Sequence, residues 1–329
     1  MSKTTVALVT TAQALGPRHE ALARNAEANG LIELVVMDEE QGVAAIVDHC
    51  RDAEVLICRN IDMINEVAVG LRNLKLIQTF SAGTDRLDKH ILASRDVHVA
   101  NNGGANAVSV AESAIWLMLT INHKFQEHIA SVRAGQWQGG VTGPLSEFTT
   151  MHDRQVGIVG LGRIGSRVAK RLQAWECNVV YHDVVDLADD YVAATGAKAV
   201  ALDELIETSD MVSLHVPLDR ATHHLFGVEQ FKAMKSTAVL INTCRGPVVD
   251  EGALVAALQA GEIWGAGLDV TEQEPMSMGS ELLNLPNVVI TPHLATKAIQ
   301  SEWNADANVV ANAERIARGE EPEWVVAPV

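Results

Sequence analysis

Three side chains suited to acid–base and anion chemistry follow short apolar runs in the last third of the sequence. They are Arg245 after the run Ala238–Asn242, Glu274 after Gly265–Val270, and His293 after Val288–Thr291. If these runs are parallel strands, their carboxyl ends share one edge of the sheet. We therefore expect a guanidinium, a carboxylate and an imidazole to lie at one site.

This combination fits the reduction of a 2-oxo acid. The guanidinium fork of Arg245 can bind a carboxylate and polarise a carbonyl. His293 titrates near neutrality and can donate a proton, and a carboxylate such as Glu274 on its second nitrogen would fix the tautomer and raise the imidazole pKa. Taken singly, each residue also has an ordinary explanation as a helix cap, a solvated turn or a structural histidine.

A source of hydride is indicated by the segment Val156–Asp183, which has the pattern strand, glycine turn, helix, strand. Gly160, Gly162 and Gly165 form a GxGxxG turn, which places the phosphates of a dinucleotide on free N–H groups at a helix N-terminus. Asp183 follows about 20 residues on, where its carboxylate can accept both ribose hydroxyls and repel a 2′-phosphate. Because Val184 and Val185 follow without an arginine, the sequence predicts NAD rather than NADP.

The elements that must position these residues form an α/β pattern in both halves of the chain. Before residue 100, apolar runs alternate with polar, Ala-rich segments, which predicts a parallel sheet covered by helices. These runs are Val6–Val9, Leu34–Met37, Val55–Cys58, Leu76–Phe80 and Val97–Ala100. A similar alternation follows the glycine turn and predicts a second, doubly wound sheet.

At 329 residues the chain is long enough to form two domains. The breaker cluster Asn101–Gly104 marks a boundary, and we expect one long helix from about Ser109 to Val132 with Glu112 in its first turn. The last helix, near Thr296–Arg318, would return to the first domain. We thus predict a substrate domain of residues 1–101 plus 296–329 and a NAD-binding domain of residues 102–295, with the site in the cleft between them.

Two features of the first domain could bind an anion. The small residues Ser81-Ala82-Gly83 follow a strand, so their successive N–H groups could form a nest for a carboxylate. The alternative is a plain turn in which Asp85 caps the next helix. Arg59 is a candidate for substrate specificity, although an arginine there is more often a surface ion-pair partner.

Composition excludes several classes of function. The chain has 25 Lys and Arg against 42 Asp and Glu, a formal net charge of −17, so nucleic acid and anionic membranes are improbable partners. The four cysteines have no ligand spacing, so we expect no metal site and no disulfide framework. The apolar runs are too short for a signal peptide or a membrane span, which favours a cytoplasmic protein.

In order along the chain, these motifs resemble the signatures of the D-isomer-specific 2-hydroxyacid dehydrogenase family. The core of the resemblance is Gly160–Gly165 with Asp183, Cys244-Arg245-Gly246, Leu268-Asp269-Val270 with Glu274-Pro275, and Thr291-Pro292-His293. It extends to Ser81–Asp85 as a substrate-carboxylate loop, Val110-Ala111-Glu112 as the start of an interdomain helix, and His215–Leu218 with Thr222 as the adenine-side wall. Essentially the whole chain is covered.

The resemblance implies two Rossmann-like domains, a flavodoxin-like substrate domain and a doubly wound NAD-binding domain, in a homodimer. It implies an NAD-dependent oxidoreductase in which Arg245 anchors the substrate, Glu274 partners His293, and His293 is the general acid/base. The N–H groups of Ala82 and Gly83, together with Ser81, would hold the substrate carboxylate, and Asp269 would meet the nicotinamide amide. The other cofactor contacts implied are Gly160, Gly162, Arg163, Ile164, Gly165, Asp183, His215, Val216, Pro217, Thr222, Thr243, Cys244, Val110 and Ala295.

Three alternatives share this scaffold. The formate branch has Gln where Glu274 stands, so Glu274 favours hydroxyacid or phosphite chemistry. Phosphite oxidation, and NADH sensing by a corepressor-like binding protein, stay open. The sequence does not decide among glyoxylate, hydroxypyruvate, lactate-like and bulkier acids, nor the direction of reaction or the role of the connection Gly135–His152.

Overall fold

The structure is a computed structural model that describes residues 3–137 and 148–328. Its chain divides into two compact units, and each is described separately. The first unit contains Met1–Asn106 and Lys297–Val329, and the second contains Ala107–Thr296. Much of the connection Gly135–His152, residues 138–147, lies outside the described residues.

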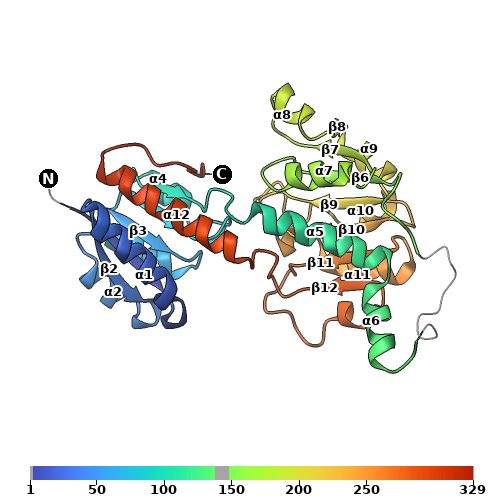
Figure 1. Cartoon of the computed structure of the whole chain (residues 1–329), viewed down its shortest axis with the longest axis horizontal. Helices are drawn as coiled ribbons and strands as arrows, with labels where there is room; N and C mark the ends of the chain where they lie inside the picture. The colour runs from blue at the N-terminus through green and yellow to red at the C-terminus, as the bar shows by residue number, and fades with distance from the viewer. Residues whose placement is uncertain (1–2, 138–147, 329) are drawn as a thin grey trace. The chain divides into compact units, whose positions relative to one another are not determined.

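The first unit is built on a parallel five-stranded sheet in the order β2-β1-β3-β4-β5 (Figure 1). Its strands are β1 (Thr4–Thr10), β2 (Ile32–Asp38), β3 (Val55–Cys58), β4 (Leu76–Thr79) and β5 (His98–Ala100). This order is that of flavodoxin-like folds, so the predicted fold class is confirmed for this unit. Strands β3 and β4 are buried along their whole length, as expected for a parallel sheet covered on both faces.

Alternate residues of β1 point to two different layers of helices. Val6 and Leu8 pack with one cluster, which also takes Val309 from the C-terminal helix. Ala7 and Val9 pack with the other. The helices are α1 (Ala12–Asn29), α2 (Val43–His49), α3 (Met63–Gly70), α4 (Lys89–Ala93) and α12 (Ile299–Ala317), with a 3-10 turn, η1 (Glu39–Gln41). Helix α12 lies beside α1 although the whole second unit separates them in sequence (Figure 1).

The second unit contains a parallel seven-stranded sheet in the order β12-β11-β10-β9-β6-β7-β8. The strands are β6 (Gln155–Val159), β7 (Asn178–His182), β8 (Lys198–Ala199), β9 (Met211–Leu214), β10 (Val239–Asn242), β11 (Gly265–Leu268) and β12 (Val288–Ile290). The sheet is doubly wound, because strand order reverses at β6. Ligands of such sheets bind at the carboxyl ends of strands beside this switch point.

Helices cover both faces of this second sheet (Figure 1). The helices are α5 (Ala107–Asn122), α6 (Phe125–Arg133), α7 (Gly165–Gln173), α8 (Asp189–Ala193), α9 (Leu202–Thr208), α10 (Val228–Ala233) and α11 (Glu251–Ala260), with 3-10 turns η3 (Gly246–Val248) and η4 (Glu281–Asn284). Helices α5 and α7 pack on one face and α9, α10 and α11 on the other. Two core clusters therefore fix the sheet from both sides.

The single helix expected from Ser109 to Val132 is wrong. Helix α5 ends at Asn122, and Lys124 has a left-handed backbone with φ of +50° before α6 begins. The Lys124 ammonium lies 5.5 Å from the ring centroid of Trp264, a cation–π contact that helps hold the turn. Because α5 begins at Ala107, Glu112 is not in its first turn either, and it lies 3.5 Å from the guanidinium of Arg171.

The alternative that Asp85 caps a helix is also wrong. Helix α4 is capped by Asp88, whose carboxylate accepts the N–H of Ile91 at 3.0 Å. Asp85 instead accepts a hydrogen bond from the side chain of Asn60 at 3.3 Å.

Among the described residues, no helix is long and apolar enough to cross a bilayer. The same residues contain no group of three or more His, Cys, Asp or Glu side chains arranged to hold a metal ion.

Candidate active site

The glycine turn joins β6 to α7 in a shape that side chains would block. Gly160 has φ of +91°, and a Cβ there would lie 2.7 Å from the carbonyl oxygen of His215. A Cβ on Gly165 would lie 2.1 Å from the carbonyl oxygen of Gly160. Beside Gly162, by contrast, the space within 4 Å is open. The turn therefore presents bare backbone at the point where a pyrophosphate would approach.

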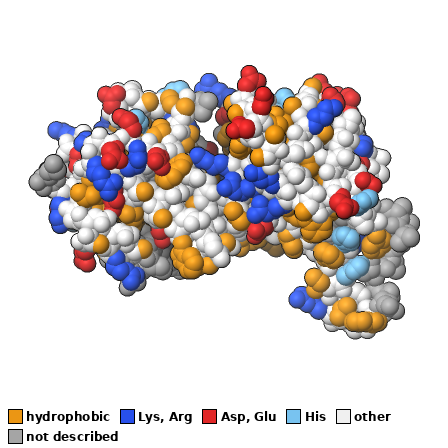
Figure 2. Space-filling view, turned by 45° about the horizontal axis from the view of Figure 1, so that its top comes forward, with side chains coloured by type: hydrophobic (Ala, Val, Ile, Leu, Met, Phe, Trp, Pro, Cys, Tyr) orange, Lys and Arg blue, Asp and Glu red, His pale blue; other side chains and the backbone are white. Residues whose placement is uncertain are grey.

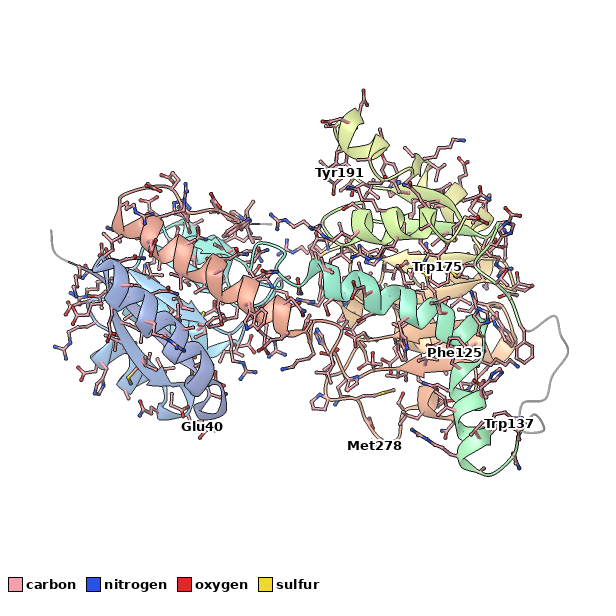
Figure 3. The ribbon with its side chains drawn as sticks, viewed as in Figure 1. Glu40, Phe125, Trp137, Trp175, Tyr191 and Met278 are labelled. Atoms are coloured by element: carbon pink, nitrogen blue, oxygen red, sulfur yellow. The ribbon has the colours of Figure 1, made fainter. Side chains whose placement is uncertain are left out.

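Asp183 directly follows β7 and holds this turn by a hydrogen bond. One of its carboxylate oxygens accepts the N–H of Leu161 at 2.8 Å, and the other accepts the N–H of Val185 at 3.0 Å. Each carboxylate oxygen has two lone pairs, so both keep one for a ribose hydroxyl. The hydroxyl of Tyr191 from α8 donates to the carbonyls of Leu161 at 3.0 Å and Gly162 at 3.2 Å (Figure 3). The sequence analysis missed Tyr191, since no motif marks it.

Two buried polar atoms at the same edge have no hydrogen-bond partner among the described residues. They are Nδ1 of His215, after β9, and the hydroxyl oxygen of Thr243, after β10. Burial lowers the pKa of His215 to about 3, so its ring is neutral at pH 7. Unpaired buried polar groups are costly and call for a ligand or water. Together with the open glycine turn and the carboxylate of Asp183, they fit a nicotinamide dinucleotide.

The structure brings Glu274 and His293 into direct contact. Nδ1 of His293 lies 2.7 Å from a carboxylate oxygen of Glu274, whose other oxygen accepts the N–H of Thr271 at 3.2 Å. An ionised carboxylate only accepts, so Nδ1 carries a proton and Nε2 is the atom that can exchange one. Both side chains are 39% exposed, which leaves the pair open to a substrate.

The pair shifts both pKa values in the direction of charge separation. The hydrogen bond that His293 donates to Glu274 raises the pKa of His293 above its usual value, against burial, which lowers it. Burial alone would raise the pKa of Glu274, but the hydrogen bond and charge of His293 hold this pKa below its usual value. At neutral pH the carboxylate is therefore ionised and the imidazole is poised to be protonated.

Asp269 holds the turn that carries His293. One of its carboxylate oxygens accepts the hydroxyl of Thr291 at 2.6 Å and the N–H of Leu294 at 3.0 Å. The other accepts the N–H of Ala295 at 2.9 Å, and the Asp269 carbonyl accepts the N–H of His293 at 2.7 Å. The side chain is buried. Sequence analysis placed Asp269 only on the cofactor and missed these contacts, because they join segments that the pattern treats separately.

Arg245 follows β10 and begins the 3-10 turn η3. Its guanidinium donates to the carbonyl of Cys244 at 2.7 Å. Its charge contributes to the low pKa of Glu274 and partly opposes the rise in the pKa of His293. The next residue, Gly246, packs so closely that a Cβ there would lie 1.9 Å from the carbonyl oxygen of Thr271. The turn bearing Arg245 is thus in contact with the loop bearing Glu274.

The remaining candidates of the second unit lie around this edge. Ala295 is buried, and its carbonyl accepts the hydroxyl of Ser109 at 2.6 Å, which ties the start of α5 to the His293 turn. Val110 is buried in the first turns of α5.

Past β9, Thr222 donates to the carbonyl of Pro217 at 2.7 Å and shapes the loop that includes Val216. Arg163 and Ile164 complete the glycine turn, and Cys244, whose thiol pKa burial raises to about 11, donates to the side chain of Asn242 at 3.1 Å.

In the first unit, side chains hold the loop Ser81-Ala82-Gly83 by donating hydrogen bonds to its carbonyl oxygens. Its three carbonyl oxygens accept from the hydroxyl of Thr79, the amide of Asn101 and the hydroxyl of Ser81, at 2.9, 3.2 and 2.8 Å. The backbone of the loop is therefore fixed in one conformation. Arg59 forms an ion pair with Glu39 at 2.8 Å, so much of its charge is compensated within the unit.

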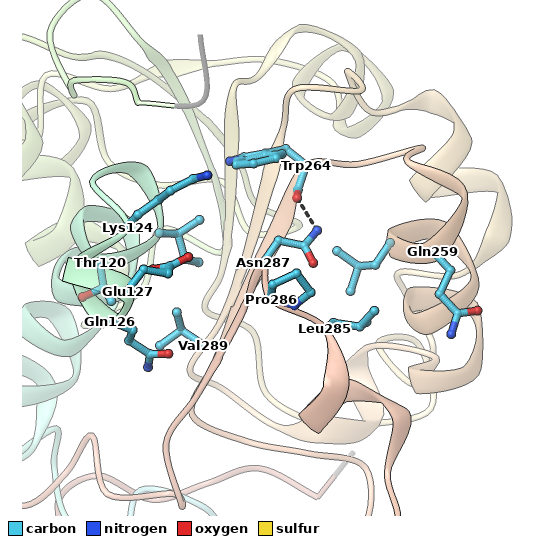
Figure 4. Close-up of a pocket in the computed structure, with 12 residues that line it drawn as sticks. Thr120, Lys124, Gln126, Glu127, Gln259, Trp264, Leu285, Pro286, Asn287 and Val289 are labelled. Atoms are coloured by element: carbon cyan, nitrogen blue, oxygen red, sulfur yellow. Dashed lines mark hydrogen bonds between the residues drawn. The ribbon is translucent and has the colours of Figure 1, made fainter. Parts of the chain in front are cut away.

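A pocket of about 550 Å³ lies elsewhere in the second unit (Figure 4). Trp264 and Asn287, which line it, directly precede β11 and β12. It is therefore at the amino ends of these strands, opposite the edge that carries His293. The wall beyond the sheet is formed by α5 and α6, including Lys124.

Comparison with known proteins agrees with this geometry. Residues 115–295 match the sequence model of the family described as "D-isomer specific 2-hydroxyacid dehydrogenase, NAD binding domain". The chain is 37% identical over 287 residues to a glyoxylate reductase of Thermofilum pendens, covering 85% of this chain and 83% of the relative. It is 38% identical over 261 residues to a glyoxylate/hydroxypyruvate reductase B of Escherichia coli, covering 79% and 80%.

The fold of this chain is also similar to that of a solved reductase structure. The NADPH-dependent glyoxylate/hydroxypyruvate reductase of Sinorhizobium meliloti, in complex with NADP and malonate, is 30% identical. Its fold matches with a TM-score of 0.84 over 99% of this chain and 98% of that one.

Proposed function

Because this chain belongs to the D-isomer-specific 2-hydroxyacid dehydrogenase family, we propose that it interconverts a small 2-oxo acid and the corresponding D-2-hydroxy acid with NAD(H). The reaction class is that of an NAD(P)-dependent oxidoreductase. The observation that carries the proposal is the 2.7 Å contact between His293 and Glu274, on the same sheet edge as the glycine turn.

In the proposed mechanism, Arg245 binds the substrate carboxylate and polarises its carbonyl, and the N–H groups of Ala82 and Gly83 also bind the carboxylate. When bound, NADH supplies the hydride to C2. His293 gives the proton on Nε2 to the carbonyl oxygen, and Glu274 stabilises the imidazolium before transfer and orients the ring throughout. In the oxidative direction His293 takes the hydroxyl proton instead.

The cofactor would be held by the residues that fit it. Gly160, Gly162 and Gly165 with Arg163 and Ile164 would bind the pyrophosphate, and Asp183 the adenosine ribose. The loop His215–Pro217 with Thr222 would form the adenine side. Thr243, Cys244, Asp269, Val110 and Ala295 would line the nicotinamide side.

We propose glyoxylate or hydroxypyruvate as substrate, with lactate-like acids as the next candidates. The relatives named above act on the first two, and the identity to them exceeds 35%. The test follows NADH absorbance at 340 nm while purified protein meets a panel of 2-oxo acids. Consumption of a bulky acid in preference to both would refute the substrate assignment and leave the reaction class standing.

Phosphite oxidation and NADH sensing are not favoured by the relatives. Adding phosphite and NAD+ to the same assay tests the first. If the protein binds NADH tightly but reduces none of the 2-oxo acids in the panel, NADH sensing becomes the favoured function.

We expect Glu274→Gln to shift the pH dependence of reduction. Reduction needs protonated His293, and the negative charge of Glu274 raises the pKa of that histidine. Without the charge this pKa falls, so kcat/KM for reduction declines at a lower pH than in the native enzyme, while oxidation becomes possible at lower pH. The measurement is a pH profile of kcat/KM in both directions. The exposed residue Glu229 gives the control, Glu229→Gln, and a variant profile that coincides with the native one would contradict the assignment.

We expect Asp183→Ser to weaken NADH binding by about 10- to 100-fold, because charged hydrogen bonds contribute about 1.5–3 kcal/mol. The same change removes the repulsion of a 2′-phosphate, so the preference for NADH over NADPH narrows. Fluorescence titration with both cofactors measures this. Asp186→Ser, at an exposed position on the same segment, is the control. A native enzyme that prefers NADPH would show that the NAD assignment is wrong.

We propose that the protein is a homodimer that uses the outer face of α6. Hydrophobic and histidine side chains gather on the part of the second unit that holds α6 (Figure 2). Phe125, Ile129, Val132 and Trp137 are between 41% and 78% exposed. Gln126 and Glu127 of the same helix line the pocket of Figure 4. An exposed apolar patch of this kind marks a protein interface. Ile129→Asp is expected to yield monomers in light scattering coupled to gel filtration, whereas Val69→Asp, equally exposed on α3, leaves the mass unchanged. A native mass of one chain would contradict the proposal.

A cytoplasmic location is the last part of the proposal. All four cysteines are free thiols, as a reducing compartment requires. Cell fractionation with an antibody against the protein is the direct test.

A further inference from the structure

The loop that carries Glu274 contains a second acidic side chain, Glu272, which is engaged on both of its oxygens. One lies 2.8 Å from Nε2 of His224, and the other accepts the N–H of Glu251 at 3.2 Å. In return, the carboxylate of Glu251 accepts the N–H of Glu272 at 3.1 Å. Because an ionised carboxylate only accepts, Nε2 of His224 must donate. Hydrogen bonds thus connect the loop to Glu251, the first residue of α11, and to His224.

His224 also holds the turn that carries Arg245. Its backbone N–H donates to the carbonyl of Pro247 at 2.8 Å. Its φ is +52°, a left-handed conformation that is uncommon for residues other than glycine, although Asn, Asp and His adopt it more often than most. One residue therefore touches both loops, at Pro247 just after Arg245 and at Glu272 just before Glu274.

We propose that His224 and Glu272 form a positioning pair that sets the spacing of Arg245 and Glu274 and, through Glu274, the orientation of His293. The inference rests on the proposed roles of Arg245 and His293. Only Gln273 separates Glu272 from Glu274, so movement of Glu272 is passed directly to the carboxylate on Nδ1 of His293. Displacements of about 1 Å at a reacting group can cost about 10²-fold in rate.

Exposure of the pair separates this role from a contribution to folding. The side chains of His224 and Glu272 are 36% and 38% exposed. Ion pairs at such positions add little to stability, since water screens them and their side chains lose freedom. A role in positioning therefore predicts a loss of activity without a matching loss of thermal stability.

The test compares Glu272→Ala with the native enzyme. We expect kcat for reduction to fall about 10- to 100-fold. The pH limit of reduction, that is, the pH above which kcat/KM for reduction declines, should also become lower, as expected for Glu274→Gln. The KM for NADH and the melting temperature should stay close to native. In a Glu274→Gln background, Glu272→Ala should cause little further shift of the pH limit, because the carboxylate it positions is gone. The control is Glu229→Ala, which removes the exposed Glu229–Lys232 pair of α10 in the same unit.

Two His224 variants test the other half of the pair. His224→Gln keeps a side-chain donor for Glu272 and should retain more activity than His224→Ala. If Glu272→Ala lowers only the melting temperature, or if both His224 variants behave alike, the proposal is overturned. Should Glu272→Ala not fold, Glu272→Gln carries the comparison with a smaller expected loss, because its one acceptor oxygen can serve His224 but its NH2 group cannot accept the N–H of Glu251.

A readout that needs no turnover separates this inference from the proposed function. The imidazole of His293 can be titrated by NMR in native protein, Glu272→Ala and Glu229→Ala, with His293→Gln to assign the signal. A lower His293 pKa in Glu272→Ala alone supports the positioning pair even if no 2-oxo acid is reduced. An unchanged titration overturns it even if the enzyme is active.

Discussion

Replacing His293 with Gln is expected to lower kcat for reduction by about 10²–10⁴-fold, the usual contribution of a general acid. Glutamine keeps the size and polarity of the side chain but has no proton to give near neutral pH. Its amide can still donate to Glu274, so the loop should keep its shape. Binding of NADH, which the proposal assigns to the glycine turn and Asp183, should be unaffected.

Two measurements on the same preparation check this prediction. Steady-state kinetics with the preferred 2-oxo acid give kcat, and fluorescence titration gives the NADH dissociation constant. His90→Gln, on α4 of the first unit, serves as a control for loss of an imidazole. If His293→Gln keeps kcat within a factor of about ten of native, another group donates the proton and the mechanism fails.

Replacing Arg245 with Lys is expected to lower kcat/KM for the 2-oxo acid by about 10²–10³-fold, the cost of removing a preorganised donor at a developing charge. Lysine keeps the charge but lacks the planar fork that binds a carboxylate with two hydrogen bonds. It would also lose the bond from the guanidinium to the carbonyl of Cys244. We expect KM to rise as well as kcat to fall, since Arg245 is proposed both to bind the substrate carboxylate and to polarise the substrate carbonyl.

The matched control is Arg51→Lys, whose side chain is 65% exposed on the first unit and pairs with Asp48. Far-ultraviolet circular dichroism shows whether the variant at Arg245 is folded. Native kcat/KM in folded Arg245→Lys protein would remove Arg245 from the mechanism. It would then direct attention to Arg59 as the substrate anchor.

Where an element has a strong apolar pattern and a clear end, the sequence predicted it well. Strand β3 has the bounds expected, Val55–Cys58, and β10 and β12 differ by one residue from the runs Ala238–Asn242 and Val288–Thr291. In each case a largely buried run of strand formers agrees with the tertiary environment. Strand β8 and helix α8 were missed, because neither contains a buried residue and so neither gives an apolar pattern.

The break between α5 and α6 shows why tertiary contacts override such patterns. No Gly or Pro occurs in the segment from Ser109 to Val132, so helical periodicity continues through it. At this turn the Lys124 ammonium makes cation–π contacts with Trp264 at 5.5 Å and with Phe148 at 5.2 Å. Both rings lie outside the segment from Ser109 to Val132, so a local pattern within that segment does not show these contacts.

The sequence by itself determined the class of fold and the types of side chain available for chemistry, and it predicted a dinucleotide site. Strand ends, the glycine turn and Asp183 are local features, and parallel sheets bring local features of this kind to a common edge. It therefore predicted that Arg245, Glu274 and His293 belong together.

Only the tertiary structure decided how these groups are held. The contact of Glu274 with Nδ1 of His293, the bonds from the His293 turn to Asp269, and the link from Glu272 to His224 all join separate loops. Hydrogen bonds depend on distances of tenths of an ångström and on angle, and these are set by the packing of whole helices and strands. That packing fixes which nitrogen of His293 exchanges a proton, a choice that residue types alone leave open.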